Sequence, residues 1–239
     1  MKKVPVLEIF GPTIQGEGMV IGQKTMFVRT SGCDYRCSWC DSAFTWDGSQ
    51  KPKLMEAEEI VEKLEEKGGT TYNHVTISGG NPALHHGMGE VVRLLQEKGI
   101  KTAVETQGTI WQEWMTEIDD VTVSPKPPSS GMKTNWEQLD NYMTRLNNRE
   151  GNKVSLKIVI FDENDLSYAA AVHERYPEAA MFLQTGNDEI HTPDNQRLLS
   201  HLLGKYEWLV EQVLHSEQLN DVKVLPQLHT LLWGNKQGV

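Results

Sequence analysis

Predicted strands and amphipathic helices alternate along most of this chain of 239 residues. The strands are predicted at 25–30, 74–78, 101–106, 121–124, 153–161, 180–184 and 222–225. Helices are predicted between them, at 57–68 and 88–99 and near 136–148, 163–175 and 194–213. Because successive strand-helix units pair their strands in parallel through right-handed crossovers, we expect an α/β fold. Its sheet should be barrel-like, open or closed, with the helices outside.

Nothing in the sequence divides this alternation into separate units. No linker rich in Pro, Ser or Gly interrupts it, and 38% hydrophobic residues suffice for one sizeable core. We therefore expect residues 1–239 to form a single domain. The formal net charge of −10 argues against a nucleic-acid partner, because such binding depends on Lys and Arg neutralising phosphates. A small-molecule substrate is expected instead.

The start of the chain, MKKVPVLEIF, predicts neither a leader nor a membrane anchor. Pro5 and Glu8 interrupt the apolar stretch before it could serve as a secretory leader, and no run in the chain approaches the length of a membrane span. We expect a soluble, cytoplasmic protein with no membrane partner.

Polar, glycine-containing segments follow or end the predicted strands. They are the cysteine loop after residue 30, SGGNPA, ETQGT, SPKPP and QTGND. In parallel α/β sheets, ligands bind at the carboxyl ends of the strands. The sequence therefore places an active site at that end, where Glu105 and Lys126 would offer a carboxylate for ribose hydroxyls and a counter-charge for carboxylates.

Three cysteines, Cys33, Cys37 and Cys40, lie within eight residues and are all the cysteines of the chain. A disulfide framework would use an even number spread along the sequence, so thiolate ligation in a reducing compartment is the better interpretation. A cubane iron-sulfur cluster needs four ligands, and three thiolates would leave one iron open. The alternative is a zinc site completed by His or Asp, although the distant second cysteine pair of a zinc ribbon is missing.

The segment CDYRCSWC resembles the signature of radical S-adenosylmethionine enzymes, which share this cysteine spacing and an aromatic residue before the third cysteine. The resemblance implies a partial (β/α)6 barrel, a [4Fe–4S] cluster and S-adenosylmethionine bound at its open iron. SGGNPAL resembles the glycine-rich motif of that family. It departs from the family at Asn81, where an acidic residue is common and where an amide brings no charge for the amino group of the cofactor.

A longer set of segments resembles one branch of these enzymes, the 7-carboxy-7-deazaguanine synthase family. The segments are TIQGEG, FVRTSGCDYRCSWCDSAFTW, SGGNPA, ETQGT and SPK. The resemblance implies a lyase that contracts the ring of 6-carboxy-5,6,7,8-tetrahydropterin with loss of ammonia, giving 7-carboxy-7-deazaguanine for queuosine and related deazapurines. It also implies Mg²⁺, a flavodoxin or ferredoxin as reductant, and a homodimer.

This resemblance assigns site residues by position. The catalytic set is the three cysteines with Arg29, whose fork of donors suits a substrate carboxylate. The other substrate positions are Ile14, Gln15, Gly16, Ser78 and, at the apolar end of the chain, Val239. The cofactor positions are Trp39, Cys40, Asp41, Gly80, Glu105, Ser124, Pro125 and Lys126, and Ser42 is the Mg²⁺ position. The histidines after residue 170 are scattered and are interpreted as solvated or core residues.

Two other functions fit parts of the pattern. A glycyl-radical activase shares the cysteine spacing, but it would need an open groove for a polypeptide. A scaffold without catalysis would use the cysteines for metal alone and the glycines only as turns. Metal analysis distinguishes an enzyme with a cluster from a zinc-binding scaffold. About four irons per chain indicate the cubane, and about one zinc per chain indicates the scaffold.

Overall fold

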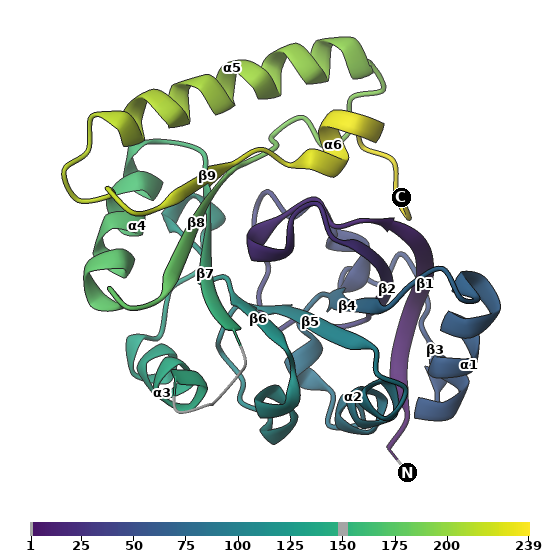
Figure 1. The fold of residues 1–239 in the computed structure, drawn as a ribbon. Coiled ribbons are helices and arrows are strands. Elements are labelled where there is room, and N and C mark those ends of the chain that lie inside the picture. The colour runs from purple at the N-terminus through teal and green to yellow at the C-terminus, as the bar shows by residue number, and fades with distance from the viewer. Residues whose placement is uncertain (1, 148–152) are drawn as a thin grey trace.

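The computed structural model describes residues 2–147 and 153–239, and these carry one nine-stranded sheet. Its strands are β1 (Val4–Ile14), β2 (Lys24–Thr30), β3 (Lys53–Met55), β4 (His74–Gly79), β5 (Lys101–Thr106), β6 (Asp120–Val123), β7 (Lys153–Ile160), β8 (Ala180–Thr185) and β9 (Lys223–Leu225). The order across the sheet is β3-β1-β2-β4-β5-β6-β7-β8-β9. Figure 1 shows this sheet curving around a central space, with the C-terminus near that space and the N-terminus away from it.

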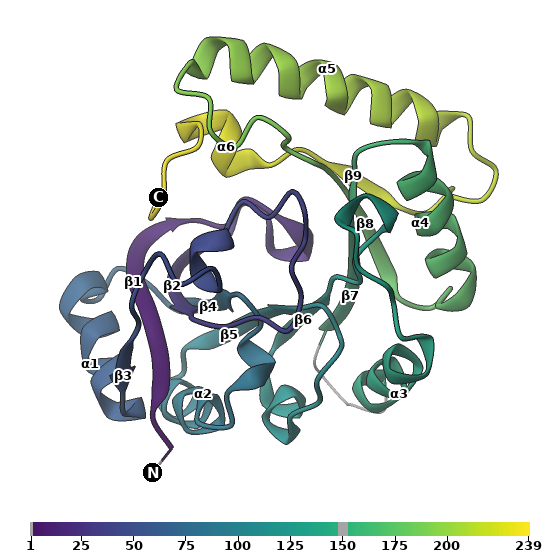
Figure 2. The same cartoon turned by 180° about the vertical axis from the view of Figure 1, so that it is seen from behind.

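From β2 to β9 every neighbouring pair of strands is parallel, while β1 pairs antiparallel with β2 and β3. The two ends of the strand order, β3 and β9, lie apart in Figures 1 and 2, so the barrel stays open. The predicted fold class, an α/β partial barrel of mostly parallel strands with outer helices, is confirmed.

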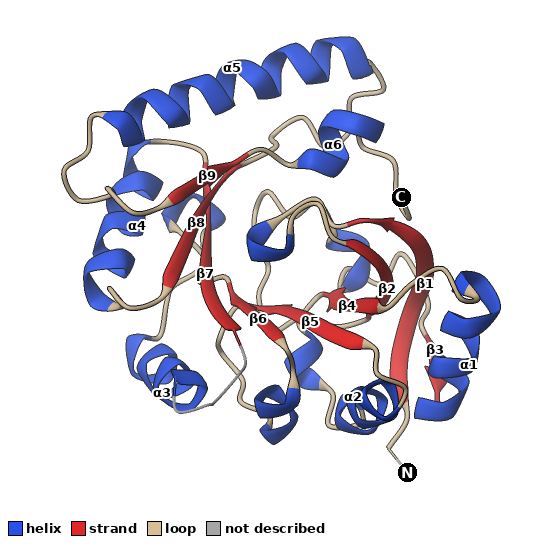
Figure 3. Cartoon of the chain, viewed as in Figure 1, coloured by secondary structure: helices blue, strands red, loops and turns tan. Residues whose placement is uncertain are grey.

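The helices cover the convex side of the sheet, except for the last one, which lies beside the cavity (Figure 3). They are α1 (Ala57–Gly68), α2 (Met88–Glu97), α3 (Trp136–Asn147), α4 (Glu163–Arg175), α5 (Asn195–Leu214) and α6 (Leu228–Trp233). Short 3₁₀ helices occupy Gly18–Val20, Ala43–Thr45, Pro82–Leu84, Glu113–Glu117 and Pro128–Ser130. No helix in the described part of the chain is long and apolar enough to cross a membrane.

The main core lies between the sheet and the outer helices. The predicted apolar face of α1 is buried there, with Ile60 and Leu64 fully covered against the strands. Removing such side chains from water contributes roughly 1.5–3 kcal/mol each, which is what fixes the helices on this side. The inner face of the sheet is left to polar and glycine residues, and this is where the site forms.

Most predicted elements match the structure, and β5 and α4 match to the residue. The last residue of the helix predicted near 136–148 lies outside the described residues. The N-terminus differs from what its composition suggests. Residues 11–14 belong to the segment GPTIQGEGMVIG, whose glycines suit a loop, but they end the 11-residue strand β1, which runs through Pro5 and Glu8. Pairing with two neighbouring strands stabilises this irregular segment. Such long-range pairing cannot be detected in the periodicity of the local sequence.

Candidate active site

A cavity of about 290 Å³ opens at the carboxyl ends of the parallel strands. Its walls come from the end of β1, the cysteine loop, the strand ends and the last residues of the chain. The sequence-predicted residues that line it are Ile14, Gln15, Gly16, Arg29, Cys33, Cys37, Trp39, Cys40, Asp41, Ser42, Ser78, Gly80, Glu105, Lys126 and Val239. Ser124 and Pro125 are buried and do not line it. Ser124 instead supports Lys126, because its hydroxyl accepts a hydrogen bond of 2.9 Å from Lys126 Nζ.

The cysteine loop begins where β2 ends and folds back over the glycine motif. A Cβ atom on Gly80 would lie 2.0 Å from the carbonyl oxygen of Gly32, so only glycine fits there. The thiols are partly buried, and burial raises the pKa of Cys37 to about 11, against the lowering effect of Lys126. Metal binding would therefore have to displace protons from these sulfurs.

The three sulfurs suit a cluster better than a single ion. No group of three His, Cys, Asp or Glu side chains within residues 2–147 and 153–239 is placed to hold one metal ion. A cubane instead binds each thiolate at a separate iron, so three cysteines spread around one cavity fit it. Donors already face the sulfurs, with Trp46 Nε1 3.4 Å from Cys40 Sγ and Tyr35 N 3.4 Å from Cys33 Sγ.

Arg29 does not lie free in the cavity. Its Nε donates to Glu8 Oε1 at 2.5 Å, and its Nη1 donates to Ser42 Oγ at 3.2 Å. The guanidinium also lies over the rings of Phe10 and Phe44, 5.3 and 5.5 Å from their centroids. The sequence missed Glu8 as a partner, because it sits on the unpredicted strand β1. The pair holds the guanidinium plane in one orientation and leaves further N–H groups for a ligand.

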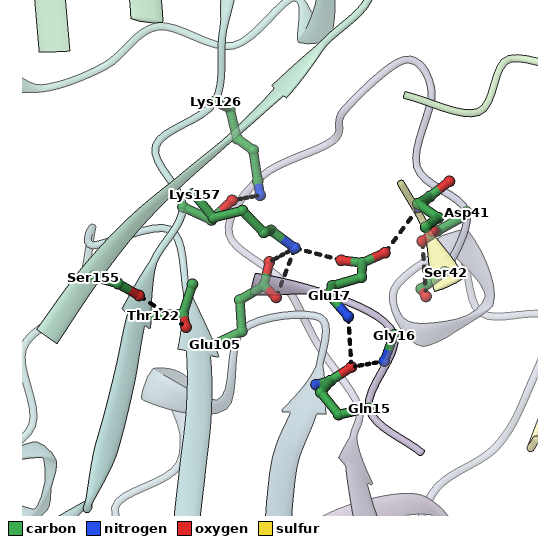
Figure 4. Close-up of polar contacts among 12 residues, drawn as sticks. Gln15, Gly16, Glu17, Asp41, Ser42, Glu105, Thr122, Lys126, Ser155 and Lys157 are labelled. Atoms are coloured by element: carbon green, nitrogen blue, oxygen red, sulfur yellow. Dashed lines mark hydrogen bonds and ion pairs between the residues drawn. The ribbon is translucent and has the colours of Figure 1, made fainter. Parts of the chain in front are cut away.

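A buried ion network that the sequence did not reveal forms one wall of the cavity (Figure 4). The ammonium of Lys157, whose side chain is 2% exposed, lies between the carboxylates of Glu105, at 2.7 Å, and Glu17. Burial alone would lower the pKa of Lys157, but these two carboxylates raise it above its usual range. Burial would raise the pKa of Glu17, yet Lys157 and His229 bring it down to about 2. Lys157 and Glu17 are therefore both charged at neutral pH.

The sequence around Lys157 could have indicated that this residue is buried and paired with an opposite charge. It is a charged residue in the middle of the apolar strand KVSLKIVI, and such a residue is rarely buried without a partner. No local pattern identifies Glu17 and Glu105 as its partners, because both lie far from Lys157 in the sequence. Glu105, assigned to ribose hydroxyls from its strand end, lines the cavity but already has both oxygens within 2.8 Å of Lys157 Nζ.

The segment after β1 closes against the C-terminal helix. The Leu228 amide donates to Gly16 O at 3.0 Å, and a Cβ on Gly16 would meet Nδ1 of His229 at 2.3 Å. His229 was interpreted as a solvated or core residue, but it lines the cavity. The amides of Gly16 and Glu17 both donate to the side-chain oxygen of Gln15, at 2.7 and 3.2 Å, so they are not free for a ligand.

Asn81 is fully used inside the protein. Its side-chain oxygen accepts from Thr106 Oγ1 at 2.9 Å and from the Ala83 amide at 3.2 Å, and its nitrogen donates to Asp34 Oδ1 at 2.8 Å. It is completely buried and does not line the cavity. Both acceptor positions of the Asn81 amide oxygen are therefore occupied by donors of the protein itself.

The last residues of the chain pack over the cavity, as its apolar tail predicted. Asn235 fastens them by donating to the carbonyl oxygens of Glu189 at 2.8 Å and Thr192 at 3.2 Å. It also accepts from Asn187 Nδ2 at 2.9 Å. This tether brings Gly238 and Val239 to the cavity wall.

Comparisons with known proteins agree with this geometry. The model of the radical SAM superfamily matches residues 27–173. The 7-carboxy-7-deazaguanine synthase of Bacillus subtilis is 62% identical, covering 100% of this chain and 99% of the relative. That of Bacillus cereus is 56% identical over 100% of both. The crystal structure of QueE from Escherichia coli has the same fold, with a TM-score of 0.64, 24% identity and 95% of each chain covered.

The fold, the three-cysteine loop and these matches place the chain in the radical SAM superfamily. Its cofactors are a [4Fe–4S] cluster and S-adenosylmethionine. Within that superfamily, the chain belongs to the 7-carboxy-7-deazaguanine synthase family, radical SAM lyases of the queuosine pathway.

Proposed function

We propose that this protein converts 6-carboxy-5,6,7,8-tetrahydropterin to 7-carboxy-7-deazaguanine with release of ammonia. The observation that carries the proposal is that one cavity is lined by the three cysteines, Arg29 and the segment Ile14 to Gly16. A radical generator and a cation suited to a carboxylate then face the same small space. The full-length relatives named for this product support the same reaction.

When bound, the cluster and S-adenosylmethionine supply a 5′-deoxyadenosyl radical able to remove a hydrogen atom from C6 of the pterin. We assign the cluster to Cys33, Cys37 and Cys40. For S-adenosylmethionine we assign Trp39, Asp41, Gly80, Glu105 and Lys126, with Ser124 and Pro125 supporting Lys126 from behind. The position of Gly80 in the cavity wall, packed directly against Gly32 of the cysteine loop, supports this assignment.

Substrate binding is assigned first to Arg29, held in orientation by Glu8. A carboxylate on the pterin would bind the N–H groups of Arg29 that do not already donate to Glu8 or Ser42. Ser78 offers a second contact, since its hydroxyl is buried and finds no hydrogen-bond partner among the described residues. A buried hydroxyl without a partner costs stability, so a ligand atom that satisfies it would bind favourably. Ile14, Gln15, Gly16 and Val239 complete the assigned substrate set.

We assign Mg²⁺ to Ser42, whose hydroxyl lines the cavity and donates to Asp41 Oδ1 at 3.0 Å. An oxygen ligand with a carboxylate beside it suits a hard cation. The protein supplies few ligands here, so substrate oxygens and waters would complete the shell, as is common for Mg²⁺. The ion would stabilise negative charge on the substrate during ring contraction.

The remaining expectations belong to the same proposal. Residues 1–239 form one domain, two copies form a homodimer, and a cytoplasmic flavodoxin or ferredoxin reduces the cluster. These rest on the family and on the continuous sheet that spans the described residues.

The test is anaerobic reconstitution of the cluster, reduction, and chromatography of the products formed from the pterin. We expect 7-carboxy-7-deazaguanine and ammonia in equal amounts, with 6-carboxypterin, the oxidised substrate, as a negative control. Cleavage of S-adenosylmethionine without a deazapurine, together with a radical on a glycine-containing protein substrate, would replace this proposal with the activase.

A further inference from the structure

One carboxylate in the cysteine loop is held by three side chains from two other segments. Asp34 Oδ1 accepts from Gln107 Nε2 at 2.6 Å and from Asn81 Nδ2 at 2.8 Å. Its other oxygen accepts from Thr109 Oγ1 at 2.6 Å. Asn81 follows β4, and Gln107 and Thr109 follow β5, so Asp34 fastens the loop to the ends of two neighbouring strands.

Gln107 connects this anchor to a cluster ligand. Its side chain is 6% exposed, and its Nε2 lies 3.6 Å from Cys33 Sγ as well as 2.6 Å from Asp34 Oδ1. An amide nitrogen has two hydrogens, so one can point to each acceptor. The bond to Asp34 is the shorter one and therefore fixes the direction of the bond to sulfur.

Hydrogen bonds to the sulfurs of an iron-sulfur centre and nearby charges both set its reduction potential. An N–H donor withdraws electron density from a thiolate and makes the reduced state more accessible. A carboxylate close to the cluster has the opposite effect. Asp34 therefore acts in two ways at once, through its own charge and through the orientation of Gln107.

We propose that Asp34 is a positioning residue that holds the Gln107 amide on the Cys33 sulfur and thereby tunes the reduction potential of the cluster. The proposal deepens the assignment of Cys33 as a cluster ligand and rests on it. It also gives Asn81 a role, since an amide at this position donates to Asp34 where an acidic residue would repel it.

The test compares two substitutions that both remove the charge of Asp34. Asp34→Asn keeps an acceptor oxygen for Gln107, whereas Asp34→Ala removes the anchor altogether. The readouts are the midpoint potential of the reconstituted cluster in an EPR-monitored redox titration and the EPR line shape of the reduced form. We expect the Asp34→Ala potential to lie below that of Asp34→Asn, because only the alanine variant loses the oriented N–H donor.

Gln107→Met removes the donor itself and should lower the potential of the wild type. In that background the difference between the two Asp34 variants should vanish. Equal potentials for the two in the presence of Gln107, or a difference that persists without it, would overturn the proposal.

Thr109 offers a milder pair that leaves the charge of Asp34 in place. Thr109→Val removes one bond to Asp34 and should shift the potential downward, while Thr109→Ser keeps the hydroxyl and should match the wild type. This pair tests the positioning role of Asp34 even if Asp34→Ala fails to hold a cluster. A midpoint potential of Thr109→Val equal to that of the wild type would refute that role. Iron content and melting of the cluster-free proteins show whether the variants fold. If all of these variants fold but bind no iron, the Asp34 anchor is needed to hold the cluster at all, and the proposal that it tunes the potential is overturned.

Discussion

The ammonium of Lys157 on β7 is bonded to the carboxylate of Glu17, which lies 140 residues earlier in the chain. The same ammonium binds Glu105 on β5, and Gln227 Nε2 donates to the other oxygen of Glu17 at 2.8 Å. One buried cation thus links the N-terminal segment, two strands of the sheet and the start of α6. Because all of these side chains line the cavity, the link ties its walls together.

We expect Lys157→Met to destabilise the protein by about 3–5 kcal/mol, because it leaves two carboxylates close together without their shared cation. Urea unfolding of the cluster-free protein measures this. Lys63→Met is the matched control, since Lys63 is 45% exposed, pairs with Glu66 on the surface of α1 and should leave the stability nearly unchanged. Adding Glu17→Gln to Lys157→Met should recover part of the loss. Equal stability of the two Lys→Met variants would contradict this role.

The buried side chain of His74 should make the stability of the protein decrease at low pH. Burial lowers its pKa from 6.5 to about 4, with a smaller opposing effect of Asp119, and its Nδ1 bonds Thr25 Oγ1 at 2.8 Å. The unfolded chain therefore takes up a proton that the folded protein refuses as pH falls from 6.5 towards 4. Stability is fully present above pH 6.5 and decreases below it, with a contribution of at most about 1.4 kcal/mol per pH unit.

Unfolding measured across that pH range should show a shallower slope for His74→Asn than for the wild type. His215 on the surface is the control, and His215→Gln should keep the wild-type slope. The same slope in His74→Asn would mean that another group titrates in this window.

Cys37→Ala should lose the visible absorbance of the cluster and all cleavage of S-adenosylmethionine, because two remaining thiolates cannot hold a stable cubane. Iron analysis and 5′-deoxyadenosine formation measure these losses. The neighbouring Ser38→Ala removes only an exposed hydroxyl that donates to Ser129 O at 2.8 Å, and it should retain both properties. Wild-type cleavage by Cys37→Ala would disprove the cluster assignment.

Ser42→Ala should slow ring contraction while the cluster stays intact, and it should raise the Mg²⁺ concentration needed for half-maximal rate by roughly tenfold or more. Ser42→Thr keeps the hydroxyl and is expected to behave like the wild type. Rates measured against Mg²⁺ concentration, with a chelator at the zero point, test this. Turnover that is indifferent to the chelator would remove Mg²⁺ from the proposal.

Much of the fold was readable from periodicity. The parallel strands from β2 onward and the helices α1 to α5 were predicted close to their observed bounds, because each buries a regular apolar face. Strand β1 was missed because Pro5, Glu8 and the Gly11–Pro12 pair break its pattern, and only pairing on both sides makes it a strand. The three-residue β3 and the short α6 gave too few residues for any period to show.

The sequence by itself determined the chemistry, because the ligands of the cluster lie within one loop at a spacing that a single cubane can span. It also placed Arg29, Ser42 and Glu105 at strand ends or beside that loop, where the parallel topology gathers them. Only the tertiary structure decided what those groups are bonded to. Arg29 pairs with Glu8, Lys157 with Glu17, and Asn81 with Asp34, each across a long stretch of chain. Such pairs depend on burial and on directions in space, and neither of these is encoded in local sequence spacing.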